Sequence, residues 1–211
     1  MKKFLIIFII FNIHISSSVD WSDPNKCNLP DHSKFISQIV SGMTLEQKVG
    51  QIIMPEINSV TPEDAKKYHF GTILNGGGGF PNQNKNSTVD DWKALSKNYF
   101  DASTEVNGMK IPILWGTDAV HGHNNVIGAT IFPHNIALGA TRNPELIRKI
   151  GDAVAKEVSS TGIIWTFAPT IAVPQNDLWG RTYEGYSEDP KLVTELGKNF
   201  ILGLQGEGKN F

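Results

Sequence analysis

Residues 111–147 read IPILWGTDAVHGHNNVIGATIFPHNIALGATRNPELI, and this stretch decides the fold class. It opens on a short apolar run, Ile111 to Trp115, that stops at Gly116. It closes on Asn143-Pro144-Glu145, a typical helix start with proline in the first turn. A buried strand, a polar loop and then a helix form the repeating unit of an α/β fold with a parallel sheet.

The same alternation continues on both sides of this stretch. Two further apolar runs of strand length, Thr72-Ile73-Leu74 and Ile163 to Ala168, are bounded by glycine or proline. Strands that alternate with helices predict an α/β fold, and at this level a doubly wound sheet and a barrel both fit.

The helices are marked by their starts and by their apolar stripes. Starts are predicted at Thr44 with Gln47 as its capping-box partner, at Thr61-Pro62, at Asn143-Pro144 and at Asp189-Pro190, and a short helical pattern covers Asp31 to Ile39. The two long helices are expected to bury the stripes Leu146, Ile150, Val154, Val158 and Leu192, Leu196, Phe200, Leu204.

Composition and one glycine run argue against a nucleic-acid partner, an internal disulfide and a dinucleotide site. The chain has 211 residues and a net charge of −2, which gives no basic surplus for a nucleic-acid partner. A single cysteine, Cys27, cannot form a disulfide within the chain. The glycine run 76–79 leads into Phe80-Pro81-Asn82, a loop and not a helix, so a dinucleotide site is not expected. No cofactor is predicted.

The N-terminus has the layout of a secretory signal. Lys2 and Lys3 precede an apolar run over residues 4–11, and small residues follow at 16–18. The run is much shorter than the roughly 20 residues that span a bilayer, so no stable membrane anchor is expected. We predict a signal peptide over residues 1–18, a secreted or periplasmic protein, and an N-terminal lead-in over residues 19–42.

Two charged residues are candidate ligands for a neutral polar substrate. Asp118 directly follows a predicted strand, where a carboxylate can accept hydrogen bonds from the hydroxyls of a sugar, although it could equally cap a turn. Arg181 lies beside Trp179 in the sequence WGRTYEGYSEDP, and its fork of donors can bind a hydroxyl or a carboxylate. It could also pair with Glu184 or Glu188 and hold the loop, and the two roles are compatible.

His121 and His123 raise a different hypothesis. A His-x-His pair at the end of a strand can bind zinc, as in metal-dependent barrel hydrolases. The further ligands are not identifiable, and His134 offers no specific signal. Two histidines hydrogen-bonded within a loop are the favoured interpretation, so no metal site is predicted.

Taken together, four stretches resemble the N-terminal barrel of glycoside hydrolase family 3. They are MTLEQKVGQI, IPILWGTDAVHGHNNVIGATIFPHNIALGATRNPELI, GIIWTFAPTIAV and WGRTYEGYSEDPKLV, in the order found in the family, and they cover residues 43–211. The long central block is most similar to the β-glucosidase and exo-β-glucanase branch. The branch that cleaves N-acetylglucosamine differs where this chain has Asp118 and His121.

The resemblance implies a partial (β/α)8 TIM-like barrel over residues 43–211, truncated at its C-terminal side, with the missing half of the barrel and a second domain elsewhere in the same protein. It implies retaining hydrolysis of terminal β-glucosides or β-glucan oligosaccharides. Asp118 and Arg181 match the residues that bind the terminal glucose, while the nucleophile and the acid/base are expected beyond Phe211. The alternatives are the metal-dependent hydrolase and a non-catalytic secreted carbohydrate-binding protein.

Overall fold

The structure is a computed structural model that describes residues 31–206. The predicted signal peptide, residues 19–30 of the predicted lead-in, and Cys27 lie outside the described residues. The helices are α1 Ser33–Gly42, α2 Leu45–Gln51, α3 Pro62–Tyr68, α4 Val89–Asp101, α5 Asn135–Ala140, α6 Pro144–Ser160 and α7 Pro190–Gln205. The strands are β1 Thr72–Asn75, β2 Thr104–Val106, β3 Met109–Ile111, β4 Leu114–Thr117 and β5 Trp165–Thr166, with short 3-10 turns η2 Pro81–Gln83 and η3 Thr182–Glu184.

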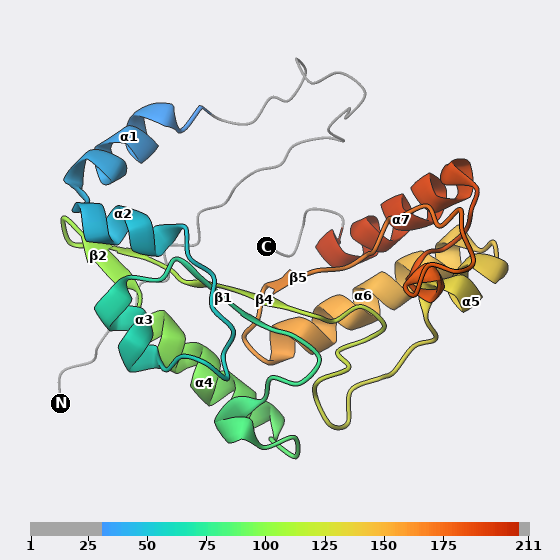
Figure 1. The fold of residues 1–211 in the computed structure, drawn as a ribbon, viewed down its shortest axis with the longest axis horizontal. Helices are drawn as coiled ribbons and strands as arrows, with labels where there is room; N and C mark the ends of the chain where they lie inside the picture. The colour runs from blue at the N-terminus through green and yellow to red at the C-terminus, as the bar shows by residue number, and fades with distance from the viewer. Residues whose placement is uncertain (1–30, 207–211) are drawn as a thin grey trace.

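A parallel sheet with the order β1-β4-β5 runs through the middle of the molecule (Figure 1). Thr72 pairs with Leu114 at the start of β1 and β4, and Gly116 pairs with Trp165 where β4 meets β5. Helices α3 and α4 lie to one side of the sheet in Figure 1, and α5, α6 and α7 lie to the other. The α/β class is confirmed, and within residues 31–206 the sheet does not close into a barrel.

Two predicted strands differ from the observed ones. The run Ile111 to Trp115 is divided: Ile111 ends β3, which pairs with β2 in an antiparallel hairpin, and the parallel strand starts only at Leu114. The hairpin turns at Asn107-Gly108, where both residues have positive φ, the conformation that a two-residue turn requires. The run Ile163 to Ala168 contributes only Trp165–Thr166 to the sheet.

The predicted helix starts are confirmed because each depends on residues close together in the sequence. Thr44 and Gln47 form a reciprocal capping box, as do Thr61 and Asp64. Asn143 accepts a hydrogen bond from the Leu146 N–H at the start of α6, and Asp189 caps α7. The pattern Asp31 to Ile39 corresponds to α1, which starts at Ser33.

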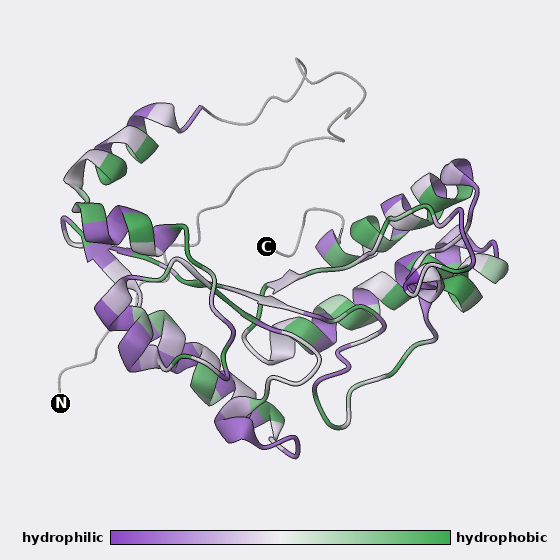
Figure 2. Cartoon of the chain, viewed as in Figure 1, coloured by the Kyte–Doolittle hydropathy of each residue, from purple (hydrophilic) through white to green (hydrophobic). Residues whose placement is uncertain are grey.

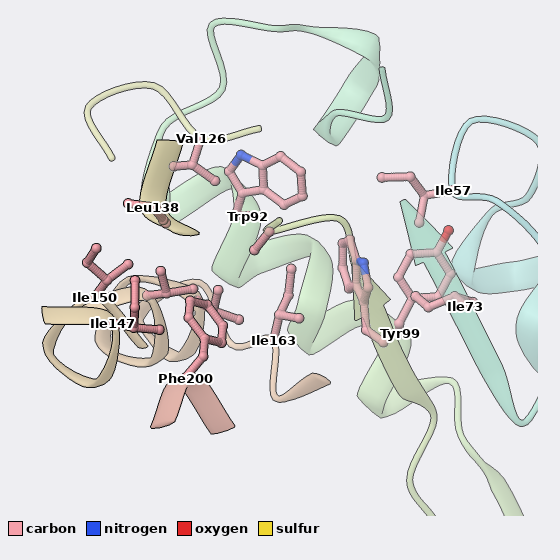
Figure 3. Close-up of a cluster of buried hydrophobic side chains, with 14 of the residues drawn as sticks. Ile57, Ile73, Trp92, Tyr99, Val126, Leu138, Ile147, Ile150, Ile163 and Phe200 are labelled. Carbon is pink, nitrogen blue, oxygen red and sulfur yellow. The ribbon is translucent and has the colours of Figure 1, made fainter. Parts of the chain in front are cut away.

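The core lies where the long helices meet the sheet (Figure 3). Trp92 and Tyr99 of α4 pack around Trp115 of β4, and Figure 3 shows Ile147, Ile150 and Phe200 gathered where α6 meets α7. In Figure 2, each of these long helices contains both hydrophobic and hydrophilic residues, as expected for a helix that is buried on one face.

The apolar stripe of α6 differs at one position from the prediction. Leu146 is 37% exposed, and its neighbour Ile147 is fully buried instead. The predicted stripe of α7 is confirmed, with Leu192, Leu196 and Phe200 buried and Leu204 packed against the core. Among residues 31–206, no helix combines the length and the apolar character needed to cross a membrane.

Candidate functional site

Asp118 lies at the carboxyl edge of the sheet, one residue beyond β4. Its backbone N–H donates to the Asn75 carbonyl at the end of β1, 3.2 Å away, so the segment that carries it is held against the neighbouring strand. Its Oδ2 lies 3.6 Å from the point that a Cβ atom would occupy at Gly76. The glycine loop after β1 therefore passes close to the Asp118 carboxylate and leaves it half-buried.

Arg181 reaches the same edge from the long loop that follows β5. Its Nε donates to Glu184 Oε1 at 2.8 Å, and its Nη2 donates to Glu184 Oε2 at 2.6 Å. This bidentate pair confirms the predicted contact with Glu184. The Glu184 side chain is largely buried, whereas 63% of the Arg181 side chain is exposed, so guanidinium N–H groups remain available to a ligand.

The charges of these three residues act on one another. Burial raises the pKa of Asp118, the nearby Glu184 carboxylate raises it further, and the Arg181 guanidinium opposes both effects. Hydrogen bonds from Arg181 lower the pKa of Glu184, and the same contact raises the pKa of Arg181. The two residues predicted as substrate ligands thus lie close enough for their charges to interact, and of the two predicted partners of the arginine, Glu184 forms the ion pair.

A row of three aromatic side chains joins the two loops. The ring of His134 stacks on His121 with centroids 4.1 Å apart, and it meets the ring of Tyr183 edge-on at 4.7 Å. His121 follows Asp118 by three residues and Tyr183 follows Arg181 by two. His121 Nδ1 lies 3.1 Å from the Phe132 carbonyl, which can only accept, so this nitrogen carries the proton.

The side chains of His121 and His123 have different surroundings. His123 is fully buried, its ring lies 6.1 Å from that of Trp92, and its Nε2 is 3.0 Å from Thr161 Oγ1. Burial lowers the pKa of His123 to about 4. Within residues 31–206, no cluster of three or more His, Cys, Asp or Glu side chains is arranged to hold a metal ion. His121 has the hydrogen-bonding contact within a loop that the sequence favoured, whereas His123 is hydrogen-bonded in the core.

Asn135, at the start of α5, was not singled out from the sequence. It is buried, and its Nδ2 donates to the Glu184 carbonyl and to Thr170 Oγ1, both at 2.9 Å. The Thr170 hydroxyl in turn donates to the same carbonyl at 2.5 Å. In Figure 1, α5 lies beside the loop that precedes α7. No local sequence pattern reveals these contacts, because the partners are 14 to 49 positions apart.

Comparisons with known proteins agree with this geometry. Residues 44–209 match the glycosyl hydrolase family 3 N-terminal domain. The chain belongs to glycoside hydrolase family 3. The resemblance found in the sequence is thus confirmed, and the described strands and helices are part of the TIM-barrel-like α/β fold of the family 3 N-terminal domain.

Relatives of this family 3 chain include the lysosomal beta glucosidase of Dictyostelium discoideum, 31% identical over 84% of this chain and 23% of the relative. The periplasmic beta-glucosidase of Salmonella typhimurium is 28% identical over 82% of this chain and 21% of the relative. Among solved structures, the exo-1,3/1,4-beta-glucanase of a Pseudoalteromonas species is 50% identical, with a TM-score of 0.77 over 84% of this chain and 22% of that one. The chain thus spans less than a quarter of the length of each.

Proposed function

We propose that the full-length protein is a glycosidase that removes terminal non-reducing β-D-glucosyl residues from β-glucosides, cello-oligosaccharides or β-glucans, with retention of configuration. The observation that carries this proposal is that Asp118, at the carboxyl edge of the sheet, lies close enough to the Arg181–Glu184 pair for their charges to interact, in a chain of family 3. The activities named for the relatives, beta-glucosidase and exo-1,3/1,4-beta-glucanase, support it.

In this proposal, Asp118 and Arg181 bind different hydroxyl groups of the same sugar. The Asp118 carboxylate accepts hydrogen bonds from hydroxyl groups, and Arg181 donates the N–H groups that Glu184 leaves free. Glu184 fixes the plane of the guanidinium, since a bidentate carboxylate defines both its position and its rotation. Neither histidine of the aromatic row is assigned a direct contact with the sugar.

Retaining hydrolysis also needs two catalytic carboxyl groups roughly 5–5.5 Å apart, one as nucleophile and one as acid/base. Asp118 is assigned to binding by its match to the family. Glu184 is an unsuitable nucleophile because both of its oxygens accept hydrogen bonds from Arg181. We assign the nucleophile and the acid/base to residues beyond Phe211, with the acid/base in a second domain, because the resemblance to family 3 implies these positions.

An assay of the full-length protein on a panel of aryl glycosides tests this function. We expect hydrolysis of the β-D-glucoside, at least about 100-fold slower hydrolysis of the N-acetyl-β-D-glucosaminide, and a β-anomer as the first product seen by NMR. A hundredfold preference corresponds to about 2.7 kcal/mol of differential transition-state binding. Faster cleavage of the glucosaminide, or an α-anomer as first product, would contradict the assignment.

We also propose that the protein is exported through residues 1–18. The lysosomal and periplasmic locations in the names of two relatives fit an exported enzyme. Mass-spectrometric sequencing of the N-terminus of protein from the secreted or periplasmic fraction should find a start near Val19. A mature protein that retains Met1 would count against export by this signal.

A further inference from the structure

The loops that carry Asp118 and Arg181 are connected through other residues. A third segment, 132–135, lies between them. On one side, His134 stacks on His121 of the Asp118 loop. On the other, His134 meets Tyr183, and Asn135 binds the backbone of Glu184, both in the Arg181 loop. Any movement of one loop relative to the other must break contacts with this segment.

Asn135 makes the most specific of these contacts. Its amide nitrogen, the Thr170 hydroxyl and the Glu184 carbonyl form a closed triangle of hydrogen bonds with edges of 2.9, 2.9 and 2.5 Å. Asn135 is only 3% exposed, so water cannot readily replace a lost partner. The triangle therefore fixes the backbone of Glu184, whose carboxylate fixes Arg181.

The helix that carries Asn135 is itself held against the same loop. At Gly139, one turn further along α5, a Cβ atom would lie only 1.7 Å from the Tyr186 carbonyl oxygen. The backbones of α5 and residue 186 are thus in direct contact, and α5 cannot approach more closely. The position of Asn135 relative to Glu184 is consequently fixed by the packing of α5 against this loop.

We propose that Asn135 is a positioning residue for the substrate site, which sets the orientation of Arg181 through Glu184. This inference rests on the proposed function, because it assumes that Arg181 binds the substrate. Asn135 is not expected to touch the sugar, and its effect on hydrolysis should disappear when Arg181 is absent. A merely structural asparagine would act independently of Arg181.

The test is a double-mutant cycle in the full-length protein, with an aryl β-D-glucoside as substrate. Asn135→Asp keeps the shape of the side chain, but its ionised carboxylate has no hydrogen to donate to the Glu184 carbonyl. We expect it to lower kcat/KM by about 10- to 100-fold, since a displacement of about 1 Å in a binding group can have such an effect. Arg181→Ala alone should lower kcat/KM further, and adding Asn135→Asp to it should change kcat/KM by less than about 3-fold.

Two further variants make the result specific. Thr170→Val removes one corner of the triangle and keeps the Asn135–Glu184 bond, so it should lower kcat/KM less than Asn135→Asp and should also lose its effect in the Arg181→Ala background. It keeps the test decisive if Asn135→Asp fails to fold. Asn199→Asp is the matched control, because Asn199 on α7 also donates its side-chain amide to a backbone carbonyl, that of Glu195 at 2.9 Å. It should leave kcat/KM within about 2-fold of the unaltered protein.

The outcomes separate failure of this inference from failure of the proposed function. If Arg181→Ala lowers kcat/KM but the effects of Asn135→Asp and Arg181→Ala multiply, or Asn135→Asp has no effect, the positioning role is overturned and the function stands. If the unaltered protein does not hydrolyse the β-glucoside, the proposed function is wrong. If Arg181→Ala hydrolyses it normally, Arg181 does not bind the substrate, and the positioning role of Asn135 is overturned with it.

Discussion

Alanine in place of Asp118 is expected to lower kcat/KM for an aryl β-D-glucoside by about 1,000-fold or more. Hydroxyl contacts that strengthen in the transition state of glycoside hydrolysis supply several kcal/mol, and each 1.36 kcal/mol is a factor of ten in rate. The half-buried setting of Asp118, with the Gly76 backbone beside it, makes such contacts stronger than they would be in open solvent. Steady-state kinetics of the purified full-length variant measures the loss.

The matched control is Asp90→Ala. Asp90 lies at the start of α4, where its side chain is 92% exposed and pairs with Lys93 at 3.7 Å. An exposed pair of this kind contributes little, so kcat/KM should stay within about 2-fold of the unaltered protein. Near-normal kinetics for Asp118→Ala would remove Asp118 from the substrate site.

The same variant distinguishes a binding residue from a nucleophile. Sodium azide can enter the space left by a nucleophilic carboxylate and form a bond to the anomeric carbon as the aglycone leaves. Because Asp118 is assigned to hydroxyl binding, azide should not restore activity to Asp118→Ala. An α-glucosyl azide product would instead identify Asp118 as the nucleophile, and the assignment of the catalytic groups beyond Phe211 would then be wrong.

Alanine in place of Gly203 is expected to destabilise the protein by about 1–2 kcal/mol, the cost of overpacking less the higher helix propensity of alanine. Gly203 of α7 is buried against α6, and a Cβ atom there would lie 2.1 Å from the Arg148 carbonyl oxygen and 3.0 Å from the Gly151 Cα. Both contacts are with backbone atoms, which no rotamer change can move, so the two helices would have to separate. Overpacking of this kind typically costs about 1–3 kcal/mol.

The sign of this effect is informative, because helix propensity alone predicts the opposite. Within a helix, alanine is favoured over glycine by about 1 kcal/mol, so an α7 that did not pack on α6 would be stabilised. The free energy of unfolding from urea titration measures the difference. Gly77→Ala provides the control, since a Cβ atom at Gly77 would meet no atom within 4 Å, and its unfolding free energy should change by less than about 0.5 kcal/mol. Equal stability of Gly203→Ala and the unaltered protein would show that α6 and α7 do not approach as closely as described.

The sequence by itself determined the features that depend on neighbouring residues. The starts of α2, α3, α6 and α7 were predicted because a capping side chain bonds to a backbone group only two or three positions away. Strand β1 was predicted almost in full because turn residues bound its short apolar run. The position of Asp118 at a strand end, and the pairing of Arg181 with Glu184, also follow from short spacings.

Only the tertiary structure decided which residues pair across long separations. An apolar run such as Ile111 to Trp115 fits a hairpin strand and a parallel strand equally well, and its division at Leu114 depends on where β1 and β2 lie. Likewise, Leu146 and Ile147 both fit the spacing of three or four residues in the α6 stripe, and only the packing of α6 against the core shows that Ile147 is the buried one. The contacts of Asn135 with Glu184 and of His134 with Tyr183 join residues 49 positions apart, and such contacts exist only once the strands have brought their loops to one edge of the sheet.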